Sequence, residues 1–253
     1  MTVRELYQNL NQMIPTDLSC EWDNDGLLCC PDGTREVRRA LIVLDVTAEA
    51  VDLALKEGYD VILSHHPMIF KGLKEINEEN YIADKVIRLL RGGVSVLSFH
   101  TRLDAVAGGV NDRLALLLGL ENAEPFGEEG IGRIGTLLQE MTAEAFATKV
   151  KKTLNAPYVN LGDARRPVRT VAVLGGGGSD DVSVAYAAGA DTYVTGELKY
   201  HQLCDAPEAG MNLIEAGHFF TEFPVTGVLA NLLTTLDPTI EYTIYNGNTV
   251  KTI

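Results

Sequence analysis

The stretch RALIVLDVTAEAVDLALKEGYDVILSHHP, residues 39–67, decides the fold. Arg39–Asp45 is apolar and β-branched, as expected of a buried strand, and Thr47–Lys56 has the spacing of a helix that Gly58 ends. Asp60–Ser64 is a second apolar strand. A strand, a helix and a strand in this order predict two parallel strands covered by the helix, which is the repeating unit of an α/β sheet.

The segments on either side continue this alternation. Upstream, Thr2–Ile14 opens with a capping box and is predicted to be a helix. Downstream, Val94–Ser98 is a predicted third strand, and Tyr81–Leu90 and Val110–Leu118 are predicted helices. The expected fold class is therefore α/β, with mainly parallel or mixed sheets.

The second half of the chain repeats the first. Residues 168–197 align with residues 37–66 without a gap, and the motif His100-Thr-Arg-Leu-Asp104 recurs as His218-Phe-Phe-Thr-Glu222. An internal duplication would give two similar α/β lobes, with the metal site in the cleft between them. The expected lobes are residues 1–127, which carry His65, His66 and Asp104, and residues 128–253, which carry His218 and Glu222.

Polar groups that follow the predicted strands are candidate metal ligands. Ser64-His65-His66-Pro67 comes directly after a buried strand, and functional groups gather beyond the carboxyl ends of strands in open α/β sheets. Two neighbouring imidazoles at this point would each hold a different metal ion. The alternative is that one caps a helix and the other packs in the core.

His100 and His218 each precede an acidic residue by four positions, which on a helical turn places both side chains on one face. Imidazole and carboxylate together suit Zn, Fe, Mn or Co. One tetrahedral ion takes four ligands, and the candidates exceed four, so two divalent transition-metal ions per subunit (Zn, Fe or Mn) are expected, with Glu222 as the bridge. The candidate metal ligands are His65, His66, Asp104, His218 and Glu222.

Three further features have two interpretations each. His100 and His201 are assigned catalytic roles beside the metals, as orienting or proton-transferring groups; for His201 the alternative is a structural hydrogen bond. Gly175–Gly178 would cradle a phosphate or form a tight turn with Ser179 as the helix cap. The acidic loop Trp22–Gly26 would line the pocket or form a capped turn.

Composition excludes several classes of function. The formal net charge of −14 disfavours binding to duplex nucleic acid. No aliphatic run is longer than that of Ala40–Leu44, which is far shorter than the roughly 20 residues of a membrane helix. No signal peptide is visible, and four cysteines without CxxC spacing indicate reduced thiols. A cytoplasmic protein without a membrane partner is expected.

These residues resemble the Nif-three-like dinuclear metal centre family, whose members are often called GTP cyclohydrolase I type 2 homologs. The matching stretches run from residue 22 to residue 222: Trp22–Asn24 with Gly26-Leu27, Asp45-x-Thr47, Ser64–Pro67, His100-Thr101 with Leu103-Asp104, Gly175–Ser179, Gly196-Glu197 with Lys199–His201, and Gly217-His218 with Thr221-Glu222. The resemblance implies a two-lobed subunit, a dinuclear centre, a ring-shaped homo-hexamer and the five metal ligands named above.

One departure from the family pattern adds a charge. The family usually has Asn where Arg102 stands, and this cation would either bind a phosphate near the metals or point to solvent. The first functional hypothesis is a metal-dependent hydrolase acting on a small-molecule substrate, a nucleotide or another small phosphorylated or heterocyclic compound. The second is a non-catalytic metal-binding ring that binds a ligand or partner, or handles metals.

Overall fold

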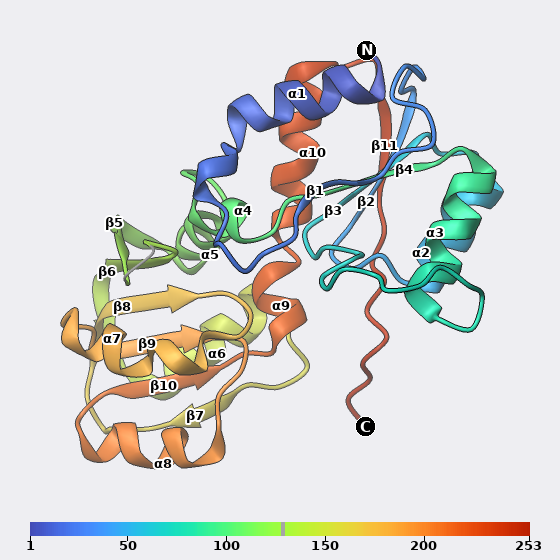
Figure 1. Cartoon of the computed structure of the whole chain (residues 1–253). Helices are drawn as coiled ribbons and strands as arrows, with labels where there is room; N and C mark the ends of the chain where they lie inside the picture. Colours follow the sequence, from blue (N-terminus) through green and yellow to red (C-terminus); the bar gives the residue numbers. More distant parts are fainter. Residues whose placement is uncertain (128–129) are drawn as a thin grey trace. The chain divides into compact units, whose positions relative to one another are not determined.

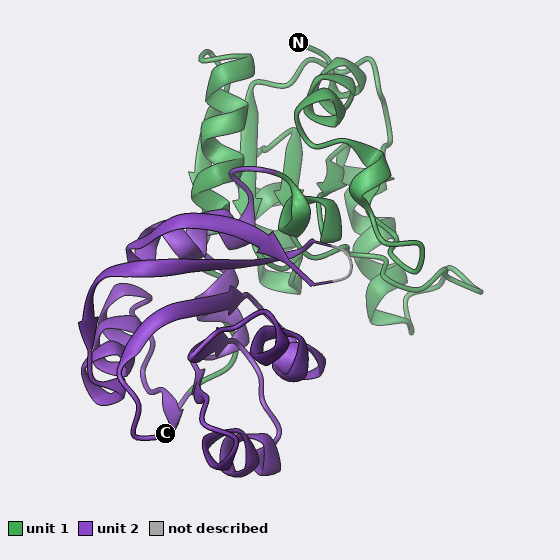
Figure 2. Cartoon of the chain, turned by 90° about the vertical axis from the view of Figure 1, so that its left-hand side faces the viewer, with its two compact units in different colours: residues 1–106, 225–251 green, residues 107–224, 252–253 purple. Residues whose placement is uncertain are grey.

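The computed structural model describes residues 1–127 and 130–253, which form two compact units. Unit 1 contains residues 1–106 and 225–251, and unit 2 contains residues 107–224 and 252–253 (Figure 2). Unit 1 is therefore built from both ends of the chain, which differs from the two contiguous lobes expected from the sequence. The expected boundary lies next to residue 128, outside the described residues.

Unit 1 is a five-stranded sheet with helices around it (Figure 1). Its helices and strands are α1 (Val3–Met13), η1 (Thr16–Leu18), β1 (Gly26–Cys29), β2 (Arg39–Val43), α2 (Ala48–Glu57), β3 (Val61–Ser64), α3 (Tyr81–Gly92), β4 (Ser95–Ser98), α4 (Thr101–Ala105), α10 (Val225–Leu236) and β11 (Glu241–Ile244). The strand order is β1-β4-β3-β2-β11. Only β1 runs antiparallel to its neighbour; the other pairs are parallel.

Helices cover both faces of this sheet. Leu41, Val43 and Ile62 face a core shared with α2 and α3, and α10 packs against α1 and β2 on the other side (Figure 1). Strands buried on both faces must be apolar at consecutive positions, which explains the unbroken run at Ala40–Leu44. The apolar run in the sequence therefore corresponds to the central strand β2 and the residue that follows it.

Unit 2 is a six-stranded sheet in the order β5-β6-β8-β9-β10-β7. Its elements are α5 (Val110–Leu118), β5 (Leu120–Phe126), β6 (Gly132–Met141), α6 (Ala143–Thr153), β7 (Asn160–Gly162), β8 (Val168–Leu174), η2 (Gly178–Asp181), α7 (Val182–Ala187), β9 (Thr192–Thr195), α8 (Tyr200–Glu208), β10 (Asn212–Glu215) and α9 (His218–Glu222). The central strands β8, β9 and β10 are parallel, and the remaining pairs are antiparallel. The sheet is mixed, as predicted.

Two separate apolar clusters cover the faces of the second sheet. Val171 and Val173 belong to a cluster with α5 and α6, whereas Ala172 and Tyr193 belong to one with α7 and α8. Consecutive residues of β8 therefore enter different cores, as the alternation of side chains along a strand requires. Both units are α/β, and the fold class predicted from the sequence is confirmed at that level.

One helical stretch, residues 218–236, is long and apolar enough by length and composition to span a membrane. It comprises α9 and α10, and the apolar face of α10 is buried, with Val225, Leu229 and Leu233 fully shielded. A core helix has the same composition, so this stretch carries no membrane assignment. None of the four cysteines, all of them in the described part of the chain, forms a disulfide, and burial raises the pKa of Cys29 to about 11, which keeps it a thiol at neutral pH.

Candidate metal centre

Strand register gathers three polar side chains at the carboxyl edge of the first sheet. Val43 pairs with Ser64, and Ser64 pairs with Ser98, on the parallel strands β2, β3 and β4. Asp45, His66 and His100 each come two residues after these paired positions. Because parallel strands end at the same edge, the three side chains emerge side by side.

The histidines at this edge, His66 and His100 together with the buried His65, are each anchored through the same ring nitrogen. His65 Nδ1–H donates to the backbone carbonyl of Phe99 at 2.9 Å, His66 Nδ1–H to Asp45 Oδ1 at 2.7 Å, and His100 Nδ1–H to Asp23 Oδ1 at 2.9 Å. The Nδ1 bond sets the tautomer, so each Nε2 carries the lone pair. Ligand atoms of these three histidines lie within 4.8 Å of one another, close enough to share a metal ion.

Asp104 joins this group from α4. Its Oδ1 lies 3.5 Å from His65 Nε2. Bonds of about 2.0–2.2 Å to one tetrahedral ion would hold an oxygen and a nitrogen roughly 3.4 Å apart, so the observed separation fits a shared metal. The spacing of four between His100 and Asp104 therefore does not bring these two residues together as a ligand pair; Asp104 faces His65 instead.

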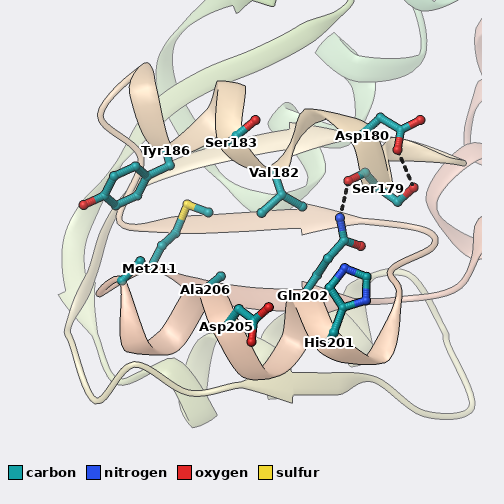
Figure 3. Close-up of a pocket in the computed structure, with 11 residues that line it drawn as sticks. Ser179, Asp180, Val182, Ser183, Tyr186, His201, Gln202, Asp205, Ala206 and Met211 are labelled. Atoms are coloured by element: carbon teal, nitrogen blue, oxygen red, sulfur yellow. Dashed lines mark hydrogen bonds between the residues drawn. The ribbon is translucent and has the colours of Figure 1, made fainter.

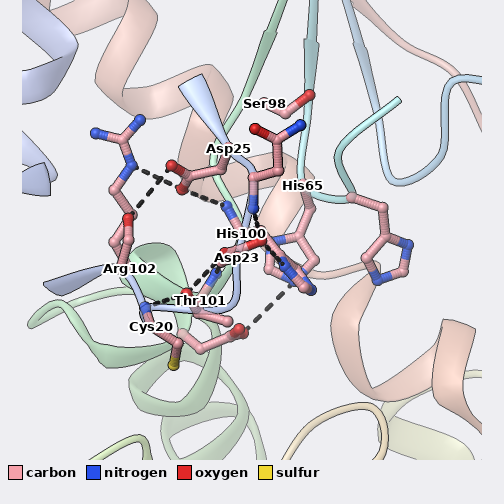
Figure 4. Close-up of polar contacts among 12 residues, drawn as sticks. Cys20, Asp23, Asp25, His65, Ser98, His100, Thr101 and Arg102 are labelled. Atoms are coloured by element: carbon pink, nitrogen blue, oxygen red, sulfur yellow. Dashed lines mark hydrogen bonds and ion pairs between the residues drawn. The ribbon is translucent and has the colours of Figure 1, made fainter. Parts of the chain in front are cut away.

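Asp23 is the anchor of the His100 loop (Figure 4). Its Oδ2 accepts hydrogen bonds from the Thr101 backbone N–H at 3.0 Å and the Thr101 hydroxyl at 2.7 Å. Burial alone would raise the pKa of Asp23, but the hydrogen bonds from His100 and Thr101 outweigh it and lower the pKa well below the usual aspartate value. Asp23 is therefore a buried, fixed anion that orients His100.

Arg102 lies inside unit 1 and not at a substrate surface. Its side chain is 0% exposed, and its Nε donates to Asp25 Oδ2 at 2.8 Å. Its Nη1 donates to Asn11 Oδ1 and to the Ile14 carbonyl, and the guanidinium lies over the Phe99 ring. The expectation that Arg102 points to solvent is therefore wrong. The guanidinium is also not accessible to a phosphate in this structure. Arg102 ties α4 to α1 and to the Asp25 loop.

Unit 2 holds a second histidine–carboxylate group. His218 Nδ1–H donates to Glu197 Oε1 at 2.8 Å, and His218 Nε2 lies 2.9 Å from Glu222 Oε2, one helical turn away on α9. With Nδ1 donating to Glu197, the Nε2 of His218 faces a second carboxylate, and a metal ion between Nε2 and Glu222 would satisfy both groups. Glu222 is 6% exposed, a burial that carboxylates rarely show without a cation. The pair predicted from spacing is confirmed as a contact.

The glycine loop after β8 leaves space for these two side chains. Gly176 has φ +69°, and a Cβ there would overlap Glu222 Oε1 and come within 3.1 Å of His218 Nε2. The Gly176 N–H donates to Thr221 Oγ1, which fixes the loop against α9. The backbone of this loop therefore passes close to the Glu222 carboxylate. Ser179 lies within η2 and does not cap α7, so the capping prediction was wrong.

His201 lies at the start of α8 in unit 2. It is exposed on α8 and lines a pocket of about 450 Å³ together with Ser179, Gln202 and Met211 (Figure 3). It makes no hydrogen bond or ion pair within the described part of the chain, whereas the neighbouring Gln202 donates to the Ser179 carbonyl. The catalytic role that the sequence assigned to His201 stays a prediction.

Sequence reasoning singled out the stretches that contain the histidine-orienting carboxylates but did not assign them this role. Asp45 and Asp23 hold imidazoles of unit 1, and Glu197 holds His218. Asp45 was detectable, because it follows β2 by the same two residues by which His66 follows β3. For Asp23 the sequence left the role of its loop open, since the antiparallel strand β1 that carries the loop to the sheet edge has no clear sequence signal.

Comparison with known proteins identifies the family of this chain. The sequence profile of the Duf34/NIF3 (NGG1p interacting factor 3) family matches residues 1–249. The chain belongs to this family. The GTP cyclohydrolase 1 type 2 homolog of Clostridium perfringens is 31% identical to this NIF3-family chain, covering 89% of the chain and 88% of the relative. The homolog of the same name from Methanocaldococcus jannaschii is 32% identical, covering 88% and 90%.

Solved structures share the fold. A hypothetical protein of Staphylococcus aureus has a TM-score of 0.89 at 28% identity, and a Bacillus cereus protein related to NIF3 has a TM-score of 0.88 at 25% identity; each match covers 100% of this chain and 99% of the other. Reduced HcgD from Methanocaldococcus jannaschii has a TM-score of 0.85 at 27% identity, covering 97% and 98%. The family resemblance inferred from the motifs is confirmed.

Proposed function

We propose that this NIF3-family protein binds two divalent transition-metal ions and hydrolyses a small nucleotide-like or other phosphorylated or heterocyclic compound. One observation carries the metal assignment: four histidines in two units all donate Nδ1–H to an anchored acceptor. Metal-binding histidines show this arrangement because it fixes the ring and directs the Nε2 lone pair. The proposed ligands are His65, His66, Asp104, His218 and Glu222.

We extend this ligand set to His100. Sequence reasoning placed His100 beside the metals as a catalytic group. Its bond to Asp23 has the same form as the His66 bond to Asp45, and its ligand atom falls in one group with those of His65 and His66. A shared geometry indicates a shared role.

The chemistry divides between the metals and the chain. Bound divalent ions would polarise the attacked centre and lower the pKa of water toward about 7. Asp23, Asp45 and Glu197 orient the imidazoles and neutralise part of the added positive charge. Zn, Fe and Mn all accept mixed nitrogen and oxygen ligands, so the donor set does not select one metal.

A duplicated α/β unit would explain why both units offer a histidine–carboxylate group. Ala40 pairs with Val61 across β2 and β3, and Val171 pairs with Thr192 across β8 and β9, at positions that differ by the same 131 residues. His66 of unit 1 then corresponds to Glu197 of unit 2. In this proposal the two edges were once alike and each unit supplies metal ligands, in a homo-hexamer located in the cytoplasm.

Metal analysis followed by a substrate screen tests the function. Protein prepared without chelator should carry close to two transition-metal ions per chain, and His66→Ala, His100→Ala and Glu222→Ala should each lower that number. Nucleotides and phosphoesters are then screened with Zn, Mn and Fe restored in turn. Hydrolysis that needs the metal supports the proposal. Two tightly held ions without turnover of any compound would favour the metal-binding ring instead, and fewer than two ions after reconstitution would exclude the dinuclear centre.

A further inference from the structure

Two exposed aromatic side chains lie against the histidines of unit 1. Trp22 is 60% exposed and Phe70 is 43% exposed. Their ring centroids lie 6.1 Å apart, and each centroid also lies 6.1 Å from that of His100. Large aromatic rings are usually buried, so two of them left in water beside candidate metal ligands need an explanation.

Neither ring is on a loose segment. Asp23, next to Trp22, is held by His100 and Thr101. Asn24 donates from its side chain to the Ile69 carbonyl, which joins the Trp22 loop to the residue before Phe70. The two loops thus hold each other and His100 in place, and the exposed rings are preorganised, which lowers the entropy lost when a ligand binds.

The shape of this surface selects its ligand. Trp22 and Phe70 meet edge to face at 69°, and His100 meets them at 77° and 86°. A flat ring can stack on one of these faces with its edge toward the other. Two side chains bury about 150–250 Å² each, well below the roughly 800 Å² per partner of a stable protein interface. A small planar molecule fits the surface better than a protein does.

We propose that Trp22 and Phe70 form a stacking surface for the planar heterocyclic ring of the substrate, beside the metal-binding histidines. This inference rests on the proposed function for its choice of substrate class, because a heterocycle stacked here extends toward His100. Base–aromatic stacking tolerates different bases, so the surface selects a flat heteroaromatic ring and not one particular base.

Fluorescence gives a direct test because Trp22 is the only tryptophan of the chain. Metal-loaded protein is titrated with guanosine and adenosine monophosphates, with ribose 5-phosphate as the probe that lacks a ring. Both nucleotides should quench the emission saturably, and ribose 5-phosphate should not. Phe70→Ala should weaken nucleotide binding by about 5- to 150-fold. Tyr81→Ala, which removes an aromatic ring 76% exposed elsewhere in unit 1, should leave binding unchanged.

The outcomes separate this inference from the proposed function. No quenching by nucleotides in protein that carries two metals and turns over a substrate would overturn the stacking surface alone. Saturable quenching in protein that binds no metal would keep the surface and remove the metal-dependent hydrolase. Equal quenching by ribose 5-phosphate would overturn the inference in favour of phosphate capture. Emission that changes only with protein concentration would overturn it in favour of contact between copies of the chain.

Discussion

Asp60 and Asp191, 131 residues apart, accept the same pair of backbone hydrogen bonds in their own units. Asp60 Oδ2 accepts from the N–H groups of Arg38 and Arg39 at 2.9 and 3.0 Å. Asp191 Oδ2 accepts from Arg169 and Thr170 at 2.9 and 2.7 Å. Asp60 thereby links the start of β2 to the residue before β3, and Asp191 links the start of β8 to the residue before β9. Both contacts lie at the amino ends of these parallel strands, away from the polar edge.

Asp60→Asn is expected to destabilise the protein by about 1–3 kcal/mol at pH 7, because hydrogen bonds to a charged acceptor are lost. Burial by itself raises the pKa of Asp60, but the bonds from Arg38, Arg39 and Arg35 lower it overall. A lowered folded-state pKa means that this stabilisation is present above the unfolded pKa of about 3.9 and is lost as pH falls through the folded value. Urea unfolding from pH 7 to pH 3 should show the difference between wild type and variant shrinking toward acid.

The exposed Asp17→Asn is the control for this experiment and should leave the unfolding free energy within about 0.5 kcal/mol of wild type. If the free energies of unfolding of wild type and Asp60→Asn differ by the same amount at pH 3 and at pH 7, the charge of Asp60 is not what stabilises unit 1.

Much of unit 1 was predictable because its signals are local. The capping box at Thr2 and the left-handed Gly58 place helix ends where the sequence indicated them. The position of β11 was not predictable: Glu241–Ile244 is short and exposed, yet it pairs with β2 from the far end of the chain. Such pairing depends on tertiary contacts that no local pattern records, and it makes unit 1 discontinuous.

Arg102→Met is expected to destabilise the protein by about 3–5 kcal/mol, because it leaves Asp25 as a buried charge without its cation. The double variant Arg102→Met with Asp25→Asn should recover part of this loss, since the uncompensated charge is then gone. Thermal unfolding of the metal-loaded proteins measures both. Unchanged stability together with a higher KM for a phosphorylated substrate would instead return Arg102 to the role of a phosphate ligand.

Gly176→Ala is expected to lower metal content while the protein stays folded. The new methyl group would displace the flexible end of Glu222, and the positive φ adds roughly 1–2 kcal/mol of strain. Gly58→Ala is a matched control, because Gly58 has φ +71° and nothing within 4 Å of an added Cβ. Both variants should lose similar stability, measured by unfolding. Equal metal content in the two, measured by elemental analysis, would contradict a ligand role for Glu222.

The candidate site shows the same division between what a sequence predicts and what it does not. His218 and Glu222 lie on one short helix, so their spacing predicted their contact. His100 and Asp104 have the same spacing, but α4 directs Asp104 to His65. His100 lies at the N-terminal end of α4 with an irregular backbone, so the helical rule does not extend to it. A four-residue spacing identifies neighbours only when both residues lie within the helix.

A homo-hexamer is expected in solution, because the family resemblance implies a ring. Light scattering coupled to size exclusion should give a mass near six times the 27.5 kDa of one chain. The measurement should be repeated after chelator treatment, since subunit contacts and metal binding are separate properties. A monomer at micromolar concentration, with metal present, would exclude the ring and leave the metal proposal untouched.

Asp45→Asn tests the anchored histidines as a metal-binding device. Asp45 Oδ1 accepts the His66 Nδ1–H at 2.7 Å, and asparagine would keep an acceptor there while removing the negative charge. Loss of a carboxylate that orients a metal-binding histidine usually costs about 10- to 100-fold in metal affinity. Asp45→Ala, which removes the acceptor as well, should lose at least as much.

Zinc titration against a chromophoric chelator measures the affinity, and the exposed Asp52→Asn on α2 is the control for a lost surface charge. Because Asp45 is half exposed, its substitution should change the unfolding free energy little, so a large drop in affinity reports on His66 and not on folding. Affinities of both Asp45 variants equal to that of wild type would mean that the bond between Asp45 and His66 serves packing at the sheet edge and that His66 is not a ligand.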